Sequence, residues 1–216
     1  AVDRCILEVS PANRLPANKE TERTRVLSDN ELKSFWLAID SLGNEVHQAT
    51  VRVLLLTGQR RSEVARMSQE ELDGNWWTIP AGRAKNGIVH RVPLSAQCRK
   101  NLNGKDRWVF PSQTANHIHP DTLSDLVLEL VGISSIGHCT AHDLRRTVGT
   151  FVQREFGSEV MHKVLNHAED KLTRIYGQYD FDKEKTLALE KWAQHLERIC
   201  FGPKTAELIG FPERRA

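Results

Sequence analysis

One stretch of the chain is so apolar that it limits the folds open to the rest. Between residues 45 and 56 apolar side chains are nearly continuous, and the run ends at Thr57-Gly58. The apolar residues are Val51, Val53, Leu54, Leu55 and Leu56. A helix that is hydrophobic on almost every side must be buried. We therefore expect a central helix inside a bundle of helices.

Helix signals lie on both sides of this segment. Ser28 followed by Glu31 is a capping box, which predicts a helix start, and Thr140 followed by Asp143 resembles another. A short helix is expected at 62–67, next to the central one, with Ser62 as its cap. The other expected helices cover residues 95–102, 120–131, 140–156, 158–166 and 182–199.

The pattern changes to that of strands between residues 76 and 93. Trp76-Trp77-Thr78-Ile79 favours a strand, with the tryptophans at its core and edge. Asn86-Gly87 is a strong hairpin signal between short segments at 82–85 and 88–93. The predicted fold class is α+β, mainly α: a helical bundle with a small antiparallel sheet of about three strands.

Charge and cysteine content limit the function. Lys and Arg total 30 against 28 Asp and Glu, a formal net charge of +2, which excludes a polybasic protein and an acidic tail. Residues 81–107 nevertheless carry seven basic side chains and one acidic one, so either a phosphate-rich partner or a solvated surface is expected there.

The four cysteines are widely spaced, and His138, Cys139 and His142 lack a fourth ligand, so no metal site or disulfide framework is expected. No stretch approaches the length of a membrane span.

Three polar motifs stand out as candidates for chemistry. The first, T-G-Q-R-R-S-E at 57–63, is a turn that could aim an arginine into a cleft. The second, H-D-L-R-R-T, places His142 and Arg145 on one face of a helix. The third, L-N-H at 165–167, is followed nine residues later by Tyr176. Taken singly, each also fits a structural role: a surface ion pair, a hydrogen-bonded pair or a core tyrosine.

The order and spacing of the three motifs together resemble the tyrosine recombinase family, the phage-integrase group. The family pattern runs T-G-x-R-x-S-E, a hairpin lysine, H-x-x-R, L-G-H and a tyrosine about nine residues on. The matching residues here are Arg60, Lys85, His142, Arg145, His167 and Tyr176. The resemblance extends from about residue 25 to 199. Asn166 stands where glycine is usual, and asparagine tolerates the left-handed conformation that a helix end often needs.

The resemblance implies a covalent reaction with DNA. Tyr176 would attack a phosphodiester to give a 3′-phosphotyrosine and a free 5′-hydroxyl, without a cofactor. Arg60 and Arg145 would clamp the phosphate oxygens in place of the metal ions used elsewhere.

The other site residues would move protons. His142 would act as base or proton relay, His167 would donate to the phosphate, and Lys85 would protonate the leaving 5′-oxygen. Tyr179 is the rival nucleophile, although a packing role suits it better. Glu63 fits a structural ion-pair partner better than an acid.

The resemblance also predicts domains and partners. Residues 1–25 would be a linker from an upstream core-binding domain, 26–199 the catalytic domain and 200–216 a tail. Since there is no initiator methionine, the chain is expected to be part of a longer protein. Its partner would be double-stranded DNA, bound in the bacterial cytoplasm at the nucleoid with the help of DNA-bending proteins. The chain would form a homotetramer on DNA through its C-terminal segment. The isolated chain would be a monomer, and the helix at 182–199 would dock either on its own core or on a neighbouring protomer.

Two other functions stay open. A related tyrosine topoisomerase shares the arginine, lysine, histidine and tyrosine set, but the short chain and the integrase-like tail argue against it. A DNA-binding module without catalysis would use the same basic surface, but all six active-site residue types are present.

Overall fold

A central helix organises the structure, a computed structural model. The residues it describes are 24–102, 104, 107–113, 116–167 and 179–203. The Asn44 side chain begins helix α2 (Glu45–Thr57) by accepting the backbone N–H of Val46 at 2.8 Å. The last five residues of α2 are all buried, and Gly58 ends the helix with a left-handed φ of 63°. The prediction of a buried central helix is confirmed.

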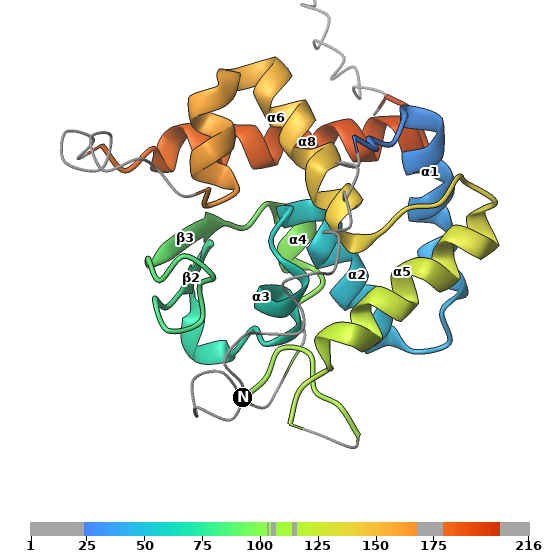
Figure 1. Ribbon diagram of the computed structural model, residues 1–216, viewed down its shortest axis with the longest axis horizontal. Coiled ribbons are helices and arrows are strands. Elements are labelled where there is room, and N and C mark those ends of the chain that lie inside the picture. The colour runs from blue at the N-terminus through green and yellow to red at the C-terminus, as the bar shows by residue number, and fades with distance from the viewer. Residues whose placement is uncertain (1–23, 103, 105–106, 114–115, 168–178, 204–216) are drawn as a thin grey trace, which may run out of the picture.

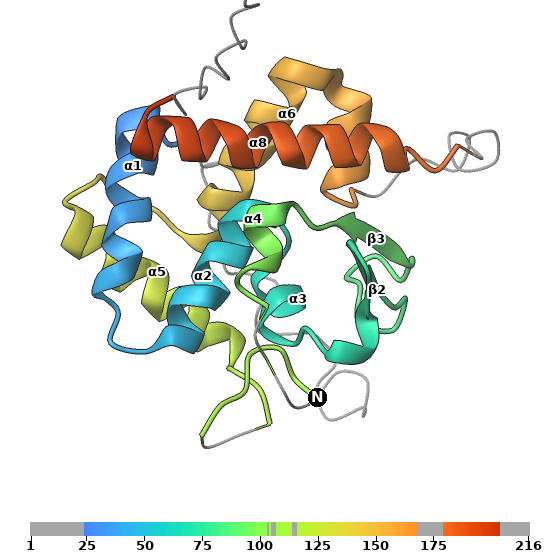
Figure 2. The same ribbon diagram turned by 180° about the vertical axis from the view of Figure 1, so that it is seen from behind.

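Four other helices lie around α2 (Figures 1 and 2). They are α1 (Asp29–Ala38), α5 (Pro120–Ser134), α6 (Ala141–Val164) and α8 (Asp182–Phe201). Helix α2 packs against α5, α6 and α8, while α1 bridges α5 and α8. Capping boxes at Ser28 and Thr140 begin α1 and α6, as predicted. Gly157 has a non-helical φ of 87° and divides α6 into two helices, which confirms the predicted break.

Shorter elements connect these helices. They are η2 (Ile39–Ser41), α3 (Arg61–Ala65), η3 (Gln69–Glu71) and α4 (Ala96–Arg99). Helix α3 follows the end of α2 after a three-residue turn. This short connection determines where the first motif residues point.

The sheet has three antiparallel strands in the order β1-β2-β3. They are β1 (Leu72–Asp73), β2 (Trp76–Ile79) and β3 (His90–Pro93). Trp77 of β2 pairs with Val92 of β3, and both side chains are buried in the core. Trp76 lies at the half-buried edge, where the Arg91 guanidinium packs 4.4 Å from the ring centroid.

The prediction of a strand at 82–85 is wrong. Residues 81–88 form turns and bends, and β2 pairs directly with β3 across this loop. The reason is a side-chain anchor: Arg83 donates to the Glu71 carboxylate at 2.7 Å and to the Glu63 carbonyl at 3.0 Å. These bonds draw the start of the loop toward η3 and α3 instead of into a ladder.

Helix α8 packs on its own chain. It contacts α6, α1 and β3, and the indole N–H of Trp192 donates to the Leu55 carbonyl of α2 at 2.8 Å. Leu189, Trp192 and Leu196 are buried, whereas Leu187 is 58% exposed. The helix at 182–199 therefore docks in cis in this structure.

Most of the expected linker and tail lies outside the described residues, which begin at 24 and end at 203. Within the described part, no helix is long and apolar enough to cross a membrane.

We predict that Trp192→Ala destabilises the fold by about 3–5 kcal/mol, because it leaves a large cavity between α8 and α2. Leu187→Ala, on the exposed face of the same helix, should change stability by less than about 0.5 kcal/mol. Urea unfolding followed by circular dichroism measures both. Equal, small losses in the two variants would show that α8 does not pack in cis in solution.

Candidate active site

The turn between α2 and α3 places the first arginine. A Cβ at Gly58 would lie 2.9 Å from Val148 of α6, so only glycine permits this approach. Arg60 follows, and the Glu63 carboxylate accepts its backbone N–H at 3.1 Å and its guanidinium at 3.0 Å. Glu63 is 1% exposed, which confirms it as a structural ion-pair partner. The prediction that Ser62 caps this helix is wrong. The N-cap of α3 is Arg60, and the Glu63 side chain accepts its backbone N–H.

Arg145 is the second arginine, and it lies buried in the first turns of α6. Its guanidinium donates to the Gly58 carbonyl at 2.9 Å and to the Leu165 carbonyl. Burial, and then the charge of Arg60, lower the pKa of Arg145 to about 10, so it stays charged at neutral pH. Among the described residues no carboxylate bonds to Arg145, so Glu63, which pairs with Arg60, is the one acidic side chain bonded to either arginine.

Two histidines stand beside this pair of charges. His142 lies one turn before Arg145, and burial, followed by the charges of Arg146 and Arg145, lowers its pKa. His167 follows the end of α6, and burial, together with Arg145 and other nearby cationic groups, lowers its pKa to about 4. Both rings are therefore neutral at pH 7 and each can accept or donate a proton.

The left-handed Asn166 turns the chain at the end of α6. Its φ is 48°, as expected for an asparagine in place of glycine at a helix end. Its carbonyl accepts the Arg60 guanidinium at 3.2 Å. The Leu165 and Asn166 carbonyls are therefore held by the two arginines, and His167 follows directly.

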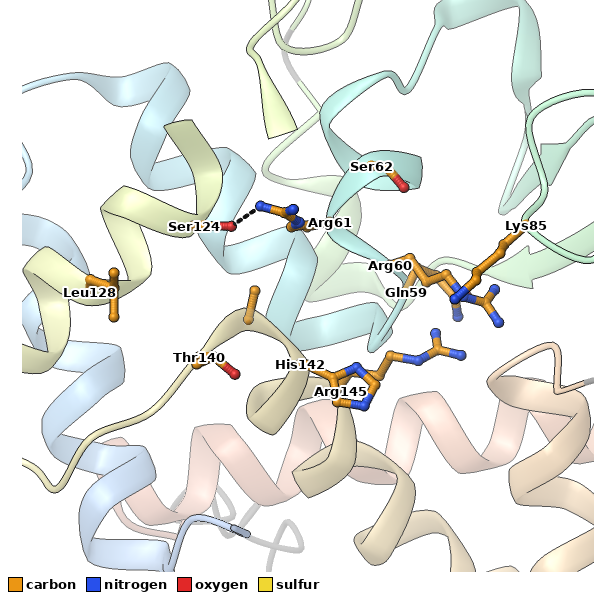
Figure 3. Close-up of a pocket in the computed structure, with 11 residues that line it drawn as sticks. Gln59, Arg60, Arg61, Ser62, Lys85, Ser124, Leu128, Thr140, His142 and Arg145 are labelled. Carbon is orange, nitrogen blue, oxygen red and sulfur yellow. Dashed lines mark hydrogen bonds between the residues drawn. The ribbon is translucent and has the colours of Figure 1, made fainter. Parts of the chain in front are cut away.

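Arg60, His142 and Arg145 line one cavity of about 400 Å³. Figure 3 shows Arg60, Lys85 and Arg145 converging on it from the α2–α3 turn, the loop before β3 and the start of α6, with His142 beside Arg145. Arg61 turns away and bonds to Asp121 and Ser124 of α5. The cavity thus presents an excess of positive charge.

The structure brings together most of the predicted site residues. Arg60, Lys85, His142 and Arg145 line the cavity. His167 lines a smaller one of about 190 Å³ that shares His142 and Arg145 with the first. Tyr176 lies outside the described residues, and its role remains a prediction.

Tyr179, the rival nucleophile, is 53% exposed and bonded to a carboxylate. Its hydroxyl donates to Glu184 at 2.9 and 3.1 Å, and this bond raises the pKa of Tyr179. A raised pKa makes the phenolate scarcer at neutral pH. The ring contacts Phe181 with centroids 4.8 Å apart, which is a packing role rather than a nucleophile's setting.

Four basic residues of segment 81–107 that the structure describes do not gather around the cavity. Arg83 and Arg91 are in ion pairs with acidic residues of η3 and α8. Arg99 lines a different pocket, beside α8. Of the four, Lys85 alone faces the cavity of the two arginines.

Sequence reasoning missed two residues at this site. Gln59, fully buried in the first motif, donates to the Val164 carbonyl at 2.9 Å, which fastens the α2–α3 turn to the end of α6. Asn86, interpreted from sequence only as a turn former, bonds to Asn166, the residue before His167. In both cases the signal was a polar residue inside a recognised motif, but its partner is about 80 or more residues away.

The histidine–cysteine sequence before α6 does not gather into a metal centre. Among the described residues no group of three or more His, Cys, Asp or Glu side chains is placed to hold a metal ion. Cys139 is buried, and burial raises the pKa of its thiol to about 12, which disfavours the thiolate that metals bind.

Comparison with known proteins identifies the family. The chain matches the phage integrase family over residues 25–183, and it belongs to that family. It is 27% identical over 186 residues to prophage integrase IntF of Escherichia coli K12, covering 79% of this chain and 38% of the relative. It is 25% identical over 186 residues to the tyrosine recombinase XerC of Pseudomonas savastanoi, covering 81% of this chain and 60% of the relative. The chain thus spans less than half of IntF and three fifths of XerC.

Solved structures agree on the fold. The integrase from mycobacterium phage Brujita superposes with a TM-score of 0.66 at 16% identity, covering 92% of this chain and 71% of that one. The lambda integrase catalytic core superposes with a TM-score of 0.57 at 16% identity, covering 69% of this chain and 94% of that one. The predicted tyrosine recombinase catalytic-domain fold is confirmed.

We predict that the His167 ring stays neutral on acidification until about pH 4. Arg60→Gln should raise the pKa of His167, because it removes one of the cationic charges that oppose its protonation. Arg52→Gln, which changes an arginine paired with Asp40, is the control and should leave it unchanged. The ring C–H signals in an NMR pH titration report both values. An ordinary His167 pKa near 6.5 would contradict the arrangement described.

Proposed function

We propose that residues 26–199 form the catalytic domain of a site-specific DNA recombinase, an integrase that cuts and rejoins strands through a 3′-phosphotyrosine. The observation that carries the proposal is the pair Arg60 and Arg145 on one cavity: Glu63 pairs with Arg60, and no carboxylate of the described residues bonds to Arg145. Such a site attracts an anion that can accept bonds from two guanidiniums. A DNA phosphodiester meets that requirement.

The arginines supply the charge that phosphoryl transfer needs. Negative charge on the nonbridging phosphate oxygens must be stabilised as the transition state forms, and guanidinium forks match that geometry. By analogy with an oxyanion hole, losing one such donor costs roughly 10²–10³ in rate. Both guanidiniums are fixed by bonds to the protein, so little reorganisation is needed when the phosphate arrives.

The nucleophile in this proposal is Tyr176, nine residues after His167. A free tyrosine has a pKa near 10, so only about 0.1% is phenolate at neutral pH, and its proton must be removed as it attacks. The lowered pKa of His142 keeps that ring neutral and able to take or relay the proton. Bonding of Tyr179 to Glu184 supports the choice of Tyr176 over its rival.

The leaving group needs a proton in exchange. The new bond joins the tyrosine oxygen to phosphorus, and the bond from phosphorus to the 5′-oxygen breaks. Lys85, on the cavity wall, gives that oxygen its proton. His167 donates its ring N–H to the phosphate. Rejoining runs the same steps backwards, so the phosphodiester energy is conserved and the proposal requires no cofactor.

The partner in this proposal is double-stranded DNA, and the reaction serves integration and excision of a mobile element in the bacterial cytoplasm. Support comes from solved relatives described as a lambda integrase dimer bound to a core site and a lambda integrase tetramer bound to a Holliday junction. We propose the same assembly here, a homotetramer on DNA with a monomeric isolated chain. In this proposal the tetramer forms through the C-terminal segment. One face of α8 packs in cis, while Leu187 and Phe201 on the same helix stay exposed.

We predict that the chain forms a covalent adduct with nicked duplexes of randomised sequence. Labelled DNA that stays bound in denaturing gels measures the adduct, and sequencing the trapped strands gives the preferred site. Tyr176→Phe should abolish the adduct and leave binding intact, while Tyr179→Phe should keep it. Binding without an adduct in the wild type would favour a DNA-binding module without catalysis, and loss only in Tyr179→Phe would reverse the assignment.

We predict that Arg60→Lys slows adduct formation by roughly 10²–10³, because an ammonium cannot make the two parallel bonds of a guanidinium. Arg61→Lys is the matched control, since Arg61 bonds to α5 instead. Single-turnover cleavage with excess EDTA measures both variants. Equal rates in the two, or a strict requirement for Mg²⁺, would contradict the proposed phosphate clamp.

A further inference from the structure

The side chain of Asn86 is fully occupied in holding the loop beside Lys85. Its amide nitrogen donates to the side-chain oxygen of Asn166 at 2.8 Å and to the Asn166 carbonyl at 3.3 Å. Its oxygen accepts the Asn166 amide at 3.2 Å and the backbone N–H of Ile88 at 3.3 Å. An asparagine side chain offers two donors and two acceptor positions, and all four are used here.

Asn166 makes this contact possible from an uncommon backbone conformation. Its φ is 48°, a region that glycine enters most easily and asparagine tolerates. A glycine would shape the chain in the same way but would leave the Asn86 amide without its side-chain partner. The asparagine therefore supplies something other than backbone geometry.

The Asn166 carbonyl is a shared acceptor for two parts of the site. It receives the Arg60 guanidinium at 3.2 Å and the Asn86 amide at 3.3 Å. His167 is the next residue. The pair Asn86–Asn166 thus fixes the loop relative to both Arg60 and His167.

The loop has few other attachments near its tip. Arg83 fastens its start to η3 and α3, and Ala84 is buried. Lys85 is exposed between this anchor and Asn86, and Gly87 follows with a left-handed φ of 68°. Lys85 therefore lies in a short segment of the loop that the Arg83 bonds hold on one side and the Asn86 bonds hold on the other.

We infer that Asn86 and Asn166 are positioning residues that hold Lys85 over the arginine pair, so that its ammonium is in place to protonate the leaving 5′-oxygen. This inference rests on the proposed function, because it assigns the pair to the proton-transfer step of that reaction. It predicts an effect on that step alone. Phosphate binding by Arg60 should remain, since Arg60 bonds to the backbone carbonyl of Asn166 and not to its side chain.

The test uses Asn166→Gly, which keeps the left-handed backbone and removes only the amide. Cleavage of ordinary DNA should slow about tenfold, the effect of losing one or two hydrogen bonds. Cleavage of DNA with a 5′-bridging phosphorothiolate should stay near the wild-type rate, because sulfur leaves without a proton. Asn86→Ala should show the same selective effect, and it also removes the bonds to the Asn166 carbonyl and to the Ile88 N–H. The double variant should be no slower than Asn86→Ala, since that change already removes the pairing of the two side chains.

Asn101→Ala is the matched control, because Asn101 donates to the Gln97 carbonyl at 2.9 Å away from the site. It should leave both substrates unaffected. Equal slowing of ordinary and phosphorothiolate DNA in Asn166→Gly would overturn the inference, as would unchanged rates on both.

Hydrogen–deuterium exchange separates this inference from the proposed function. The backbone amides of residues 84–89 should exchange faster in Asn166→Gly than in wild type and in Asn101→Ala. Unchanged exchange would overturn the inference even if the enzyme cuts DNA. If the wild type forms no adduct, the proposed function fails, and the exchange result alone decides whether the pair holds the loop.

Discussion

The hydrogen bonds from Arg145 to two helix-end carbonyls are the interaction on which the site depends. The carbonyls of Gly58 and Leu165 follow the ends of α2 and α6, where carbonyls lack partners within the helix. A buried cation at helix C-termini is also favoured by the helix dipoles, which offsets part of its desolvation. One guanidinium therefore joins three segments of chain and fixes where Arg60 and His167 lie.

The same arrangement leaves the site with unbalanced positive charge. Among the described residues Glu63 pairs with Arg60 and no carboxylate bonds to Arg145, and the charges of both arginines contribute to keeping His167 neutral, with a pKa of about 4. An incoming anion would reverse that effect, because negative charge beside a histidine favours its protonated form. The proposed binding of phosphate is thus coupled to protonation of His167. The anion that the arginines attract also favours the protonated His167 ring, which donates hydrogen bonds from both nitrogens.

Local signals predicted most of the helices, and the family resemblance predicted four of the residues that line the cavity: Arg60, Lys85, His142 and Arg145. The capping boxes at Ser28 and Thr140 and the apolar run in α2 depend on neighbours in sequence, and each prediction was confirmed. The strand at 82–85 was wrong because the Arg83 anchor involves η3, a contact with no local sign. The choice between cis and trans docking of α8 also depended on a distant contact, the bond from Trp192 to α2.

Two left-handed residues flank Arg145, and their different chemistry follows from the space around them. A Cβ at Gly58 would meet Val148 at 2.9 Å, so a side chain there would force α2 and α6 apart and pull the carbonyl from Arg145. Asn166 has room for a side chain, and that side chain reaches Asn86. A positive φ alone therefore does not require glycine; the close approach of a second helix does. This explains how a family pattern with glycine at both positions can vary at the second one and still keep the turn that presents His167.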